Sequence, residues 1–292
     1  MCAEQKPVVG FIGLGVMGKS MAGHILEAGY PLYVYNRTKS KADELLQKGA
    51  VWTDSPKAIS EKAEYIFTIV GFPEDVEEIY LGKDGLITNG RPDTYMIDMT
   101  TSSPTLAKKL YEKGKDKGIH VLDAPVSGGD IGAKEARLVI MAGGDYEVYK
   151  KVLPLFQVMG KKIDYFGEAG SGQHTKMANQ IAIASGMIGV CESLVYAKKS
   201  GLDVQKVVDL ISTGAAASFS LSSYAPRILK EDYSPGFFIK HFIKDMTIAL
   251  SEAEKMGIDL PGLKLTKQMY EKLAEMGEEN SGTQALYKYW DI

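Results

Sequence analysis

The stretch VVGFIGLGVMG (residues 8–18) runs from apolar, strand-like residues into a glycine-rich turn, and a helical pattern follows at once. Gly13 allows a tight turn, Gly15 lets a pyrophosphate approach the backbone, and Gly18 lets the helix pack close to the strand. Phosphates would lie on N–H groups at the helix N-terminus, where the helix dipole favours negative charge. The pattern predicts a dinucleotide-binding turn, and the alternative is a plain strand–helix turn that happens to contain glycines. The expected cofactor-binding residues of this turn are Gly13, Leu14, Gly15, Val16, Met17 and Gly18.

Length and composition point to an ordinary two-domain globular protein. The chain has 292 residues, of which 45% are hydrophobic and 24% charged, and its net charge is −3. This charge gives no support for nucleic acid or an anionic membrane as a partner. The two cysteines, Cys2 and Cys191, form no disulfide framework, and no secretory signal is recognised, so a cytoplasmic protein is expected. The apolar, uncharged run over residues 177–191 is shorter than the roughly 20 residues of a membrane-spanning helix.

Strand-like and helical patterns alternate in the first half of the chain. Strands are expected at residues 32–35, 50–52, 65–70, 95–99 and 120–123. Such alternation predicts a mostly parallel, doubly wound α/β sheet of the Rossmann type. A single long helix is expected from 171 to 200, with further helical segments after it. We therefore expect an NADP-binding Rossmann domain over residues 1–165 and an all-helical substrate and oligomerisation domain over residues 166–292.

The end of the second strand bears on the choice of cofactor. NAD enzymes usually carry an acidic residue there, which bonds the ribose hydroxyls. This chain has Asn36-Arg37-Thr38 instead, with Lys41 nearby. Asn36 does not repel a 2′-phosphate, Arg37 offers a planar fork for one, and Thr38 adds a hydroxyl. The tripeptide predicts NADP(H) rather than NAD(H), unless Arg37 is only a solvated charge flanking the adenine.

Loops that follow the later strands are also expected near the cofactor, because strand C-termini point toward it in this architecture. The residues of these loops that we expect to bind the cofactor are Val70, Gly71 and Thr101. The segment DAPVSGG (residues 123–129) follows another strand, and its small residues leave N–H groups and a hydroxyl to hold a carboxylate. On its own this segment reads as a flexible turn.

Two polar residues open the long helix. Lys176 and Asn179 are three residues apart and share a helix face near the expected domain junction, a preferred place for a ligand cleft. A lysine in dry surroundings can titrate in the range that suits proton transfer. Without further context, both would be ordinary solvated residues.

Together these pieces resemble the β-hydroxyacid dehydrogenase family, which includes 3-hydroxyisobutyrate dehydrogenases and semialdehyde reductases. Four blocks stand in the family's order: GLGVMG (13–18), DAPVSGG (123–129), GQHTKMANQ (172–180) and IKDM (243–246). The resemblance implies that Lys176 is the catalytic proton donor and acceptor and that Asn179 orients the substrate. It further implies that Ser127, Gly128 and Gly129 hold the substrate carboxylate, that Thr101 lies beside the nicotinamide, and that Lys244 reaches the cofactor or active site.

The function expected from these features is hydride transfer between NADP(H) and a short 3-hydroxyacid or semialdehyde, by a homodimer or homotetramer. No metal site is expected, because the histidines form no ligand spacing. Two alternatives stay open: a non-catalytic dinucleotide-binding module, and an enzyme like 6-phosphogluconate dehydrogenase, for which the chain looks short.

Overall fold

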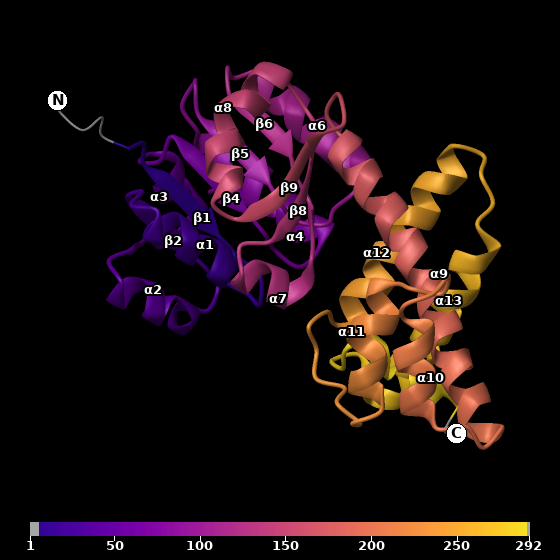
Figure 1. Cartoon of the computed structure of the whole chain (residues 1–292). Coiled ribbons are helices and arrows are strands. Elements are labelled where there is room, and N and C mark those ends of the chain that lie inside the picture. The colour runs from indigo at the N-terminus through magenta and orange to yellow at the C-terminus, as the bar shows by residue number, and fades with distance from the viewer. Residues whose placement is uncertain (1–5, 291–292) are drawn as a thin grey trace. The chain divides into compact units, whose positions relative to one another are not determined.

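The structure is a computed structural model that describes residues 6–290, and the chain divides into two compact units. Unit 1 spans Met1–Lys176 and unit 2 spans Met177–Ile292, so their boundary lies inside one long helix. Figure 1 traces the chain by residue number through both units. The domain boundary expected from the sequence, between residues 165 and 166, precedes this helix and stays a prediction. Cys2 lies outside the described residues.

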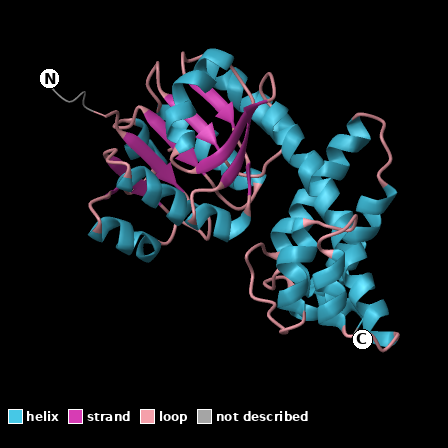
Figure 2. Ribbon diagram, viewed as in Figure 1, coloured by secondary structure: helices cyan, strands magenta, loops and turns pink. Residues whose placement is uncertain are grey.

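Unit 1 is built on a six-stranded parallel sheet, drawn in magenta in Figure 2. Its strands are β1 (Val9–Ile12), β2 (Leu32–Tyr35), β3 (Val51–Trp52), β4 (Tyr65–Thr68), β5 (Tyr95–Asp98) and β6 (His120–Asp123). Their order across the sheet is β3-β2-β1-β4-β5-β6. The chain therefore starts in the middle, winds to one edge and returns to wind toward the other, and the predicted Rossmann-type α/β fold is confirmed.

Helices cover both faces of this sheet. They are α1 (Gly18–Glu27), α2 (Asp43–Gln47), α3 (Pro56–Ser60), α4 (Pro73–Leu81), α5 (Leu86–Asn89), α6 (Pro104–Lys115) and α8 (Tyr146–Gln157), with the 3₁₀ turn η1 (Lys39–Ala42) before α2. Successive strand residues point to opposite faces. Phe67 and Ile97 pack into the core cluster that includes residues of α1, α2 and α8, while Ile66 and Met96 pack into the cluster that includes residues of α3 to α6. Burial on both faces explains why the strands read as continuous apolar runs.

A second, three-stranded sheet completes unit 1. It consists of β7 (Val126–Ser127), β8 (Leu138–Ala142) and β9 (Gly160–Tyr165), with the short helix α7 (Gly129–Lys134) between β7 and β8. β7 is antiparallel to β8, and β8 is parallel to β9. These three strands are not among those expected from the sequence. β9 lacks the apolar run of a buried strand, because Lys161 and Lys162 on it are exposed, and the sequence therefore did not predict it.

The carboxyl ends of five strands lie in one register row. Ile12 of β1 pairs with Tyr35 on one side and with Thr68 on the other; Thr68 pairs with Asp98, and Asp98 with Asp123. Every loop that the sequence nominated in unit 1 leaves the sheet at this row. In open α/β sheets, ligands bind at this edge.

Helices joined by loops make up the described residues of unit 2, with one isolated β-bridge between Phe238 and Gly282. Its elements are the greater part of α9 (Ser171–Lys199), then α10 (Val204–Ile211), α11 (Phe219–Ile228), α12 (Ile239–Lys255), α13 (Pro261–Leu273), the π-helical turn η2 (Ala274–Glu278) and the 3₁₀ helix η3 (Thr283–Trp290). The predicted all-helical region is confirmed.

Helix α9 forms part of the core of unit 2. Met187, Cys191 and Leu194 on α9 pack in one buried cluster with Phe242 of α12 and Tyr270 of α13. By length and apolar composition, α9 is the one helix of the described residues that is suited to cross a membrane. Met187, Cys191 and Leu194 pack in the core of unit 2, while 39% of the most apolar 18-residue window of α9 is buried.

Candidate active site

The glycine turn after β1 has the backbone geometry that the sequence predicted. Gly13 has φ +96°, in the left-handed region where a side chain is strained. A Cβ on Gly18 would lie 1.9 Å from the Gly13 carbonyl oxygen, so α1 starts in close contact with the turn. A Cβ on Gly15 would meet no atom within 4 Å. The exposed turn thus leaves space above Gly15, beside the N-terminal N–H groups of α1, as the predicted pyrophosphate contact requires.

Asn36 is part of the framework of this turn. Its Oδ1 accepts a hydrogen bond from Leu14 N at 2.9 Å, and its Nδ2 donates to the Thr38 carbonyl at 2.9 Å. Arg37 extends into solvent, with 79% of its side chain exposed, and its Nη1 lies 3.0 Å from Asp75 Oδ1. Thr38 precedes η1 and makes no side-chain capping bond. Of the three residues expected to bind a 2′-phosphate, Asn36 is hydrogen-bonded within the protein and Arg37 has an acidic neighbour, Asp75, that the sequence did not indicate.

Hydrogen bonds join the loops after β4 and β5. Val70 N donates to Thr100 Oγ1 at 3.0 Å, and Asp98 Oδ1 accepts from Thr100 N at 3.1 Å and from Thr68 Oγ1 at 3.0 Å. Asp98 is buried, and burial raises its pKa to about 6, although these hydrogen bonds act to lower it. This carboxyl group therefore fixes the segments that carry Val70, Gly71 and Thr101.

The pKa of Asp98 predicts a pH dependence of stability. Because its pKa in the folded protein lies above the ordinary value of 3.8, the stabilising protonated form is lost as pH rises. Between pH 4 and pH 7 the free energy of unfolding of the wild-type protein should fall by up to about 3 kcal/mol relative to that of Asp98→Asn. Urea unfolding at a series of pH values measures this difference. Parallel pH profiles for the two proteins would contradict it. Burial also raises the pKa of Asp123, but Asp123 is present in both proteins.

Asp123 and Gln173 connect the sheet to the beginning of α9. Asp123 Oδ1 accepts from Gly170 N at 2.7 Å and Oδ2 from Gln173 N at 2.8 Å, so this carboxylate caps α9 from the end of β6. The buried Gln173 side chain donates to the Thr100 carbonyl at 2.8 Å and accepts from Ser102 N at 2.9 Å. The start of α9 is thereby held against the loop that contains Thr101. Sequence reasoning did not find either role.

Lys176 lies in the part of α9 that these contacts hold. Its residue exposure is 7%, which is unusual for a lysine. Asn179 follows three positions later on the same helix and is half-buried. Lys176 therefore lies about one helical turn after Gln173, whose side chain holds the loop that contains Thr101. Asn179 lies on the same face of α9.

A polar network in unit 2 joins the last two sequence blocks. Asn179 Nδ2 donates to Gln180 Oε1 at 2.8 Å, and Gln180 Nε2 donates to Asp245 Oδ2 at 2.5 Å. Asp245 Oδ1 in turn lies 2.9 Å from Lys244 Nζ, in an ion pair that is almost fully buried. Asn179 and Lys244 are thus linked through Gln180 and Asp245, whose part in the network the sequence did not indicate.

The small-residue segment after β6 turns sharply into α7. Ser127 ends β7, and the next two residues, Gly128 and Gly129, have φ +129° and +64°. A Cβ on Gly129 would meet no atom within 4 Å. Gly129 therefore leaves room for a small ligand beside the backbone, as the predicted carboxylate site requires.

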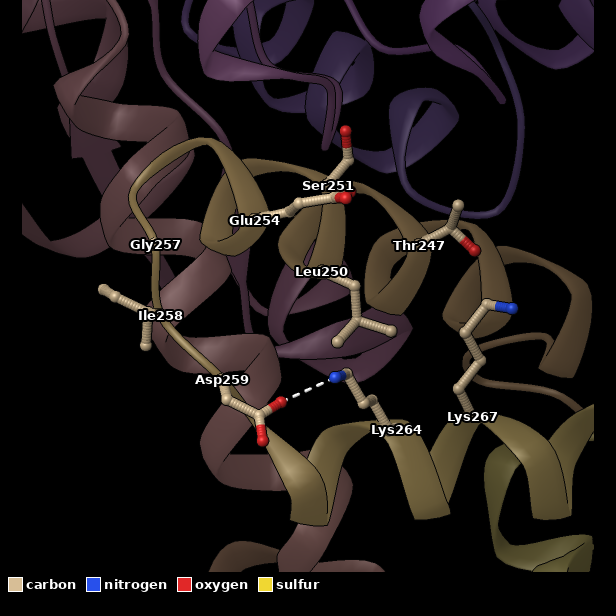
Figure 3. Close-up of a pocket in the computed structure, with 9 residues that line it drawn as sticks. All are labelled: Thr247, Leu250, Ser251, Glu254, Gly257, Ile258, Asp259, Lys264 and Lys267. Carbon is tan, nitrogen blue, oxygen red and sulfur yellow. Dashed lines mark hydrogen bonds and ion pairs between the residues drawn. The ribbon is translucent and has the colours of Figure 1, made fainter.

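A separate hollow of about 660 Å³ opens in unit 2 between α12 and α13 (Figure 3). Lys264 Nζ and Asp259 Oδ1 form an ion pair at its wall, 2.6 Å apart. It contains none of the nominated site residues. Among residues 6–290, no group of three His, Cys, Asp or Glu side chains is arranged to hold a metal ion.

Two family models match the chain. Residues 8–167 match the NAD-binding domain of 6-phosphogluconate dehydrogenase. Residues 170–290 match the model described as the NAD-binding domain of NADP-dependent 3-hydroxyisobutyrate dehydrogenase. The first match covers the sheet with its glycine turn, and the second covers α9 to η3.

Known proteins resemble the chain over almost its whole length. An uncharacterized oxidoreductase of Bacillus subtilis is 59% identical, over 98% of this chain and 99% of its own. A probable mitochondrial 3-hydroxyisobutyrate dehydrogenase-like protein of Arabidopsis thaliana is 50% identical, over 95% of this chain and 83% of its own. The solved structure of Mycobacterium tuberculosis 3-hydroxyisobutyrate dehydrogenase with L-serine is 28% identical, has a TM-score of 0.88 and covers 98% of this chain and 100% of its own.

Proposed function

Since the chain belongs to the 3-hydroxyisobutyrate dehydrogenase family of NAD(P)-dependent oxidoreductases acting on CH–OH groups, we propose that it transfers a hydride between NADP(H) and a short 3-hydroxyacid or semialdehyde. One observation carries the proposal. The buried Lys176 lies on a helix whose start is held, by Asp123 and Gln173, at the ligand-binding edge of a dinucleotide-type sheet.

The nicotinamide ring of the cofactor supplies or accepts the hydride. In the direction of reduction, negative charge grows on the carbonyl oxygen of the substrate, and Lys176 as an ammonium group bonds that oxygen and gives it a proton. In oxidation, neutral Lys176 removes the hydroxyl proton. Asn179 orients the same oxygen, and the Gln180–Asp245–Lys244 network supports Asn179.

The substrate carboxylate binds at Ser127, Gly128 and Gly129 in this proposal. Left-handed glycines present backbone N–H groups toward an anion, and the Ser127 hydroxyl adds a donor. Such a clamp orients the reacting carbon, and orientation alone contributes several kcal/mol to catalysis. The cofactor extends from the glycine turn past Val70, Gly71 and Thr101.

NADP(H) is the proposed cofactor because no acidic residue follows β2 directly and Arg37 is exposed there. Arg37→Ala should raise the Kd for NADPH about 10-fold, since a charge-assisted contact to the 2′-phosphate is lost, and change the Kd for NADH less than about 2-fold. Nicotinamide fluorescence measures both constants. Lys162→Ala, which removes an exposed cation on β9, is the control and should change neither. Equal weakening of NADPH and NADH by Arg37→Ala would contradict the assignment.

The remaining parts of the proposal concern the organisation of the protein. Residues 1–165 form the NADP-binding domain, and residues 166–292 form the domain for substrate binding and oligomerisation in a homodimer or homotetramer. The protein acts in the cytoplasm on a small carboxylate and engages neither nucleic acid nor membrane.

A turnover assay tests the proposal. We expect the protein to oxidise NADPH in the presence of at least one of glyoxylate, succinic semialdehyde, tartronate semialdehyde or methylmalonate semialdehyde, faster than it oxidises NADH. Tight NADPH binding without turnover of any of these would favour a non-catalytic binding module. Reduction of NADP⁺ by 6-phosphogluconate would favour the other alternative.

A further inference from the structure

We propose that Asp75 limits the preference of this protein for NADP(H) over NAD(H), because it competes with the 2′-phosphate for Arg37. The inference rests on the proposed function, since it takes the region of Arg37 as the site for the adenosine ribose. It concerns a residue on α4, outside every sequence block that nominated the site.

The position of Asp75 is fixed by the start of its helix. It is the third residue of α4, and its Oδ2 accepts a hydrogen bond from the backbone N–H of the N-cap residue Phe72 at 3.2 Å. Pro73 begins the helix and restricts its backbone. The Asp75 side chain is only 22% exposed, against 79% for Arg37. The carboxylate is therefore the anchored member of the ion pair, and the guanidinium is the member that can move.

The pair joins the loop after β2 to the first turn of α4, which follows the loop after β4. Arg37 follows β2, and Gly13 N in the turn donates to the Tyr35 carbonyl at 3.1 Å. Asp75 follows β4, and the Ile69 carbonyl is the group nearest to Gly13 on that side, 2.0 Å from where its Cβ would be. Arg37 Nη1 and Asp75 Oδ1, 3.0 Å apart, thus connect the segments that follow β2 and β4, on either side of the turn where the cofactor would lie.

Of the groups around the end of β2, Arg37 is the cation that has an acidic partner from another segment. The Asn36 side chain is occupied by Leu14 N and the Thr38 carbonyl. Lys39 Nζ lies over the Trp52 ring, 5.4 Å from its centre. A 2′-phosphate must therefore draw Arg37 from Asp75 or share it with that carboxylate, and the second arrangement places two anions close together. The 2′-hydroxyl group of NAD(H) carries no charge, so its binding neither requires Arg37 to leave Asp75 nor places a second anion beside that carboxylate.

The test compares cofactor binding by the wild-type protein and Asp75→Asn. The asparagine keeps an oxygen for Phe72 N but removes the charge. We expect the Kd for NADPH to fall about 3- to 10-fold and the Kd for NADH to change less than about 2-fold, with a larger NADPH effect at low salt. Glu74→Gln is the matched control, because it removes one exposed acidic charge from the same turn of α4. It should leave the ratio of the two constants unchanged.

A double variant shows whether Asp75 acts through Arg37. In the Arg37→Ala background, Asp75→Asn should lower the Kd for NADPH less than it does in the wild-type background, because only the direct repulsion between Asp75 and the 2′-phosphate is then left to remove. An unchanged or higher Kd for NADPH in the single variant Asp75→Asn, or an equal effect of Glu74→Gln, would overturn the inference. A wild-type protein that binds neither nucleotide would instead overturn the proposed function, so the two failures are distinguishable. Thermal unfolding checks that each variant is folded.

Discussion

Lys176→Met is expected to lower kcat by about 10²- to 10⁴-fold, the usual contribution of a general acid–base group. Methionine fills most of the space of this buried side chain, so the fold and the NADPH Kd should change little. Reduction of the semialdehyde substrate under saturating NADPH measures kcat, and nicotinamide fluorescence measures the Kd.

Lys199→Met supplies the control for this substitution. Lys199 ends the same helix and is exposed, so its replacement should leave kcat within about 2-fold of the wild-type value. If Lys176→Met retained more than a tenth of the wild-type kcat, another group would have to supply the proton and the assigned role of Lys176 would be wrong.

Gly18→Ala and Gly23→Ala should have opposite effects, although both glycines lie in α1. A Cβ on Gly18 would lie 1.9 Å from the Gly13 carbonyl oxygen, and the turn would have to shift. We expect the free energy of unfolding to fall by about 1–3 kcal/mol. NADPH binding should weaken at least about 10-fold, because the N–H groups of the turn would move away from the phosphates.

A Cβ on Gly23 would have its nearest neighbour, Leu45 Cδ2, at 3.8 Å, which is an ordinary contact. Gly23→Ala should therefore raise the free energy of unfolding by about 0.5–1 kcal/mol through the better helix propensity of alanine, with NADPH binding unchanged. Urea unfolding and NADPH titration of both variants check the pair. Similar results for the two variants would contradict this prediction, because they would show that the turn tolerates a side chain at Gly18, where α1 lies closest to the Gly13 carbonyl oxygen.

The parts of the site that the sequence predicted depend on local signals. The glycine turn joins a strand to a helix within 11 residues, so its geometry follows from neighbouring residues alone, and the structure has the left-handed Gly13 and the close contact at Gly18. Lys176 and Asn179 were placed on one helix face by their spacing, and α9 has the predicted start. Their catalytic roles stay predictions.

The parts that were missed depend on the order of strands in the sheet. Asp75 meets Arg37 across 38 positions of the chain because β2 and β4 both flank β1. Asp123 caps α9 across 47 positions, and Gln173 reaches the Thr100 carbonyl across 73. No spacing in the sequence indicates such pairs, since β8, β9 and their connections bring α9 back to the sheet. Only a weak signal for such contacts is present in the sequence. It is an acidic residue at a strand end, such as Asp123, combined with a polar residue in the first turn of a later helix, such as Gln173.

Isotope transfer tests the central claim most directly. The protein would be incubated with NADPH carrying deuterium on both positions of nicotinamide C4 and with the semialdehyde that it turns over fastest, and the product would be analysed by mass spectrometry. The account predicts a hydroxyacid with one deuterium on the carbinol carbon, formed in step with NADPH oxidation. A product without deuterium, or NADPH oxidation without a hydroxyacid, would contradict the claim that this chain transfers a hydride to a short semialdehyde.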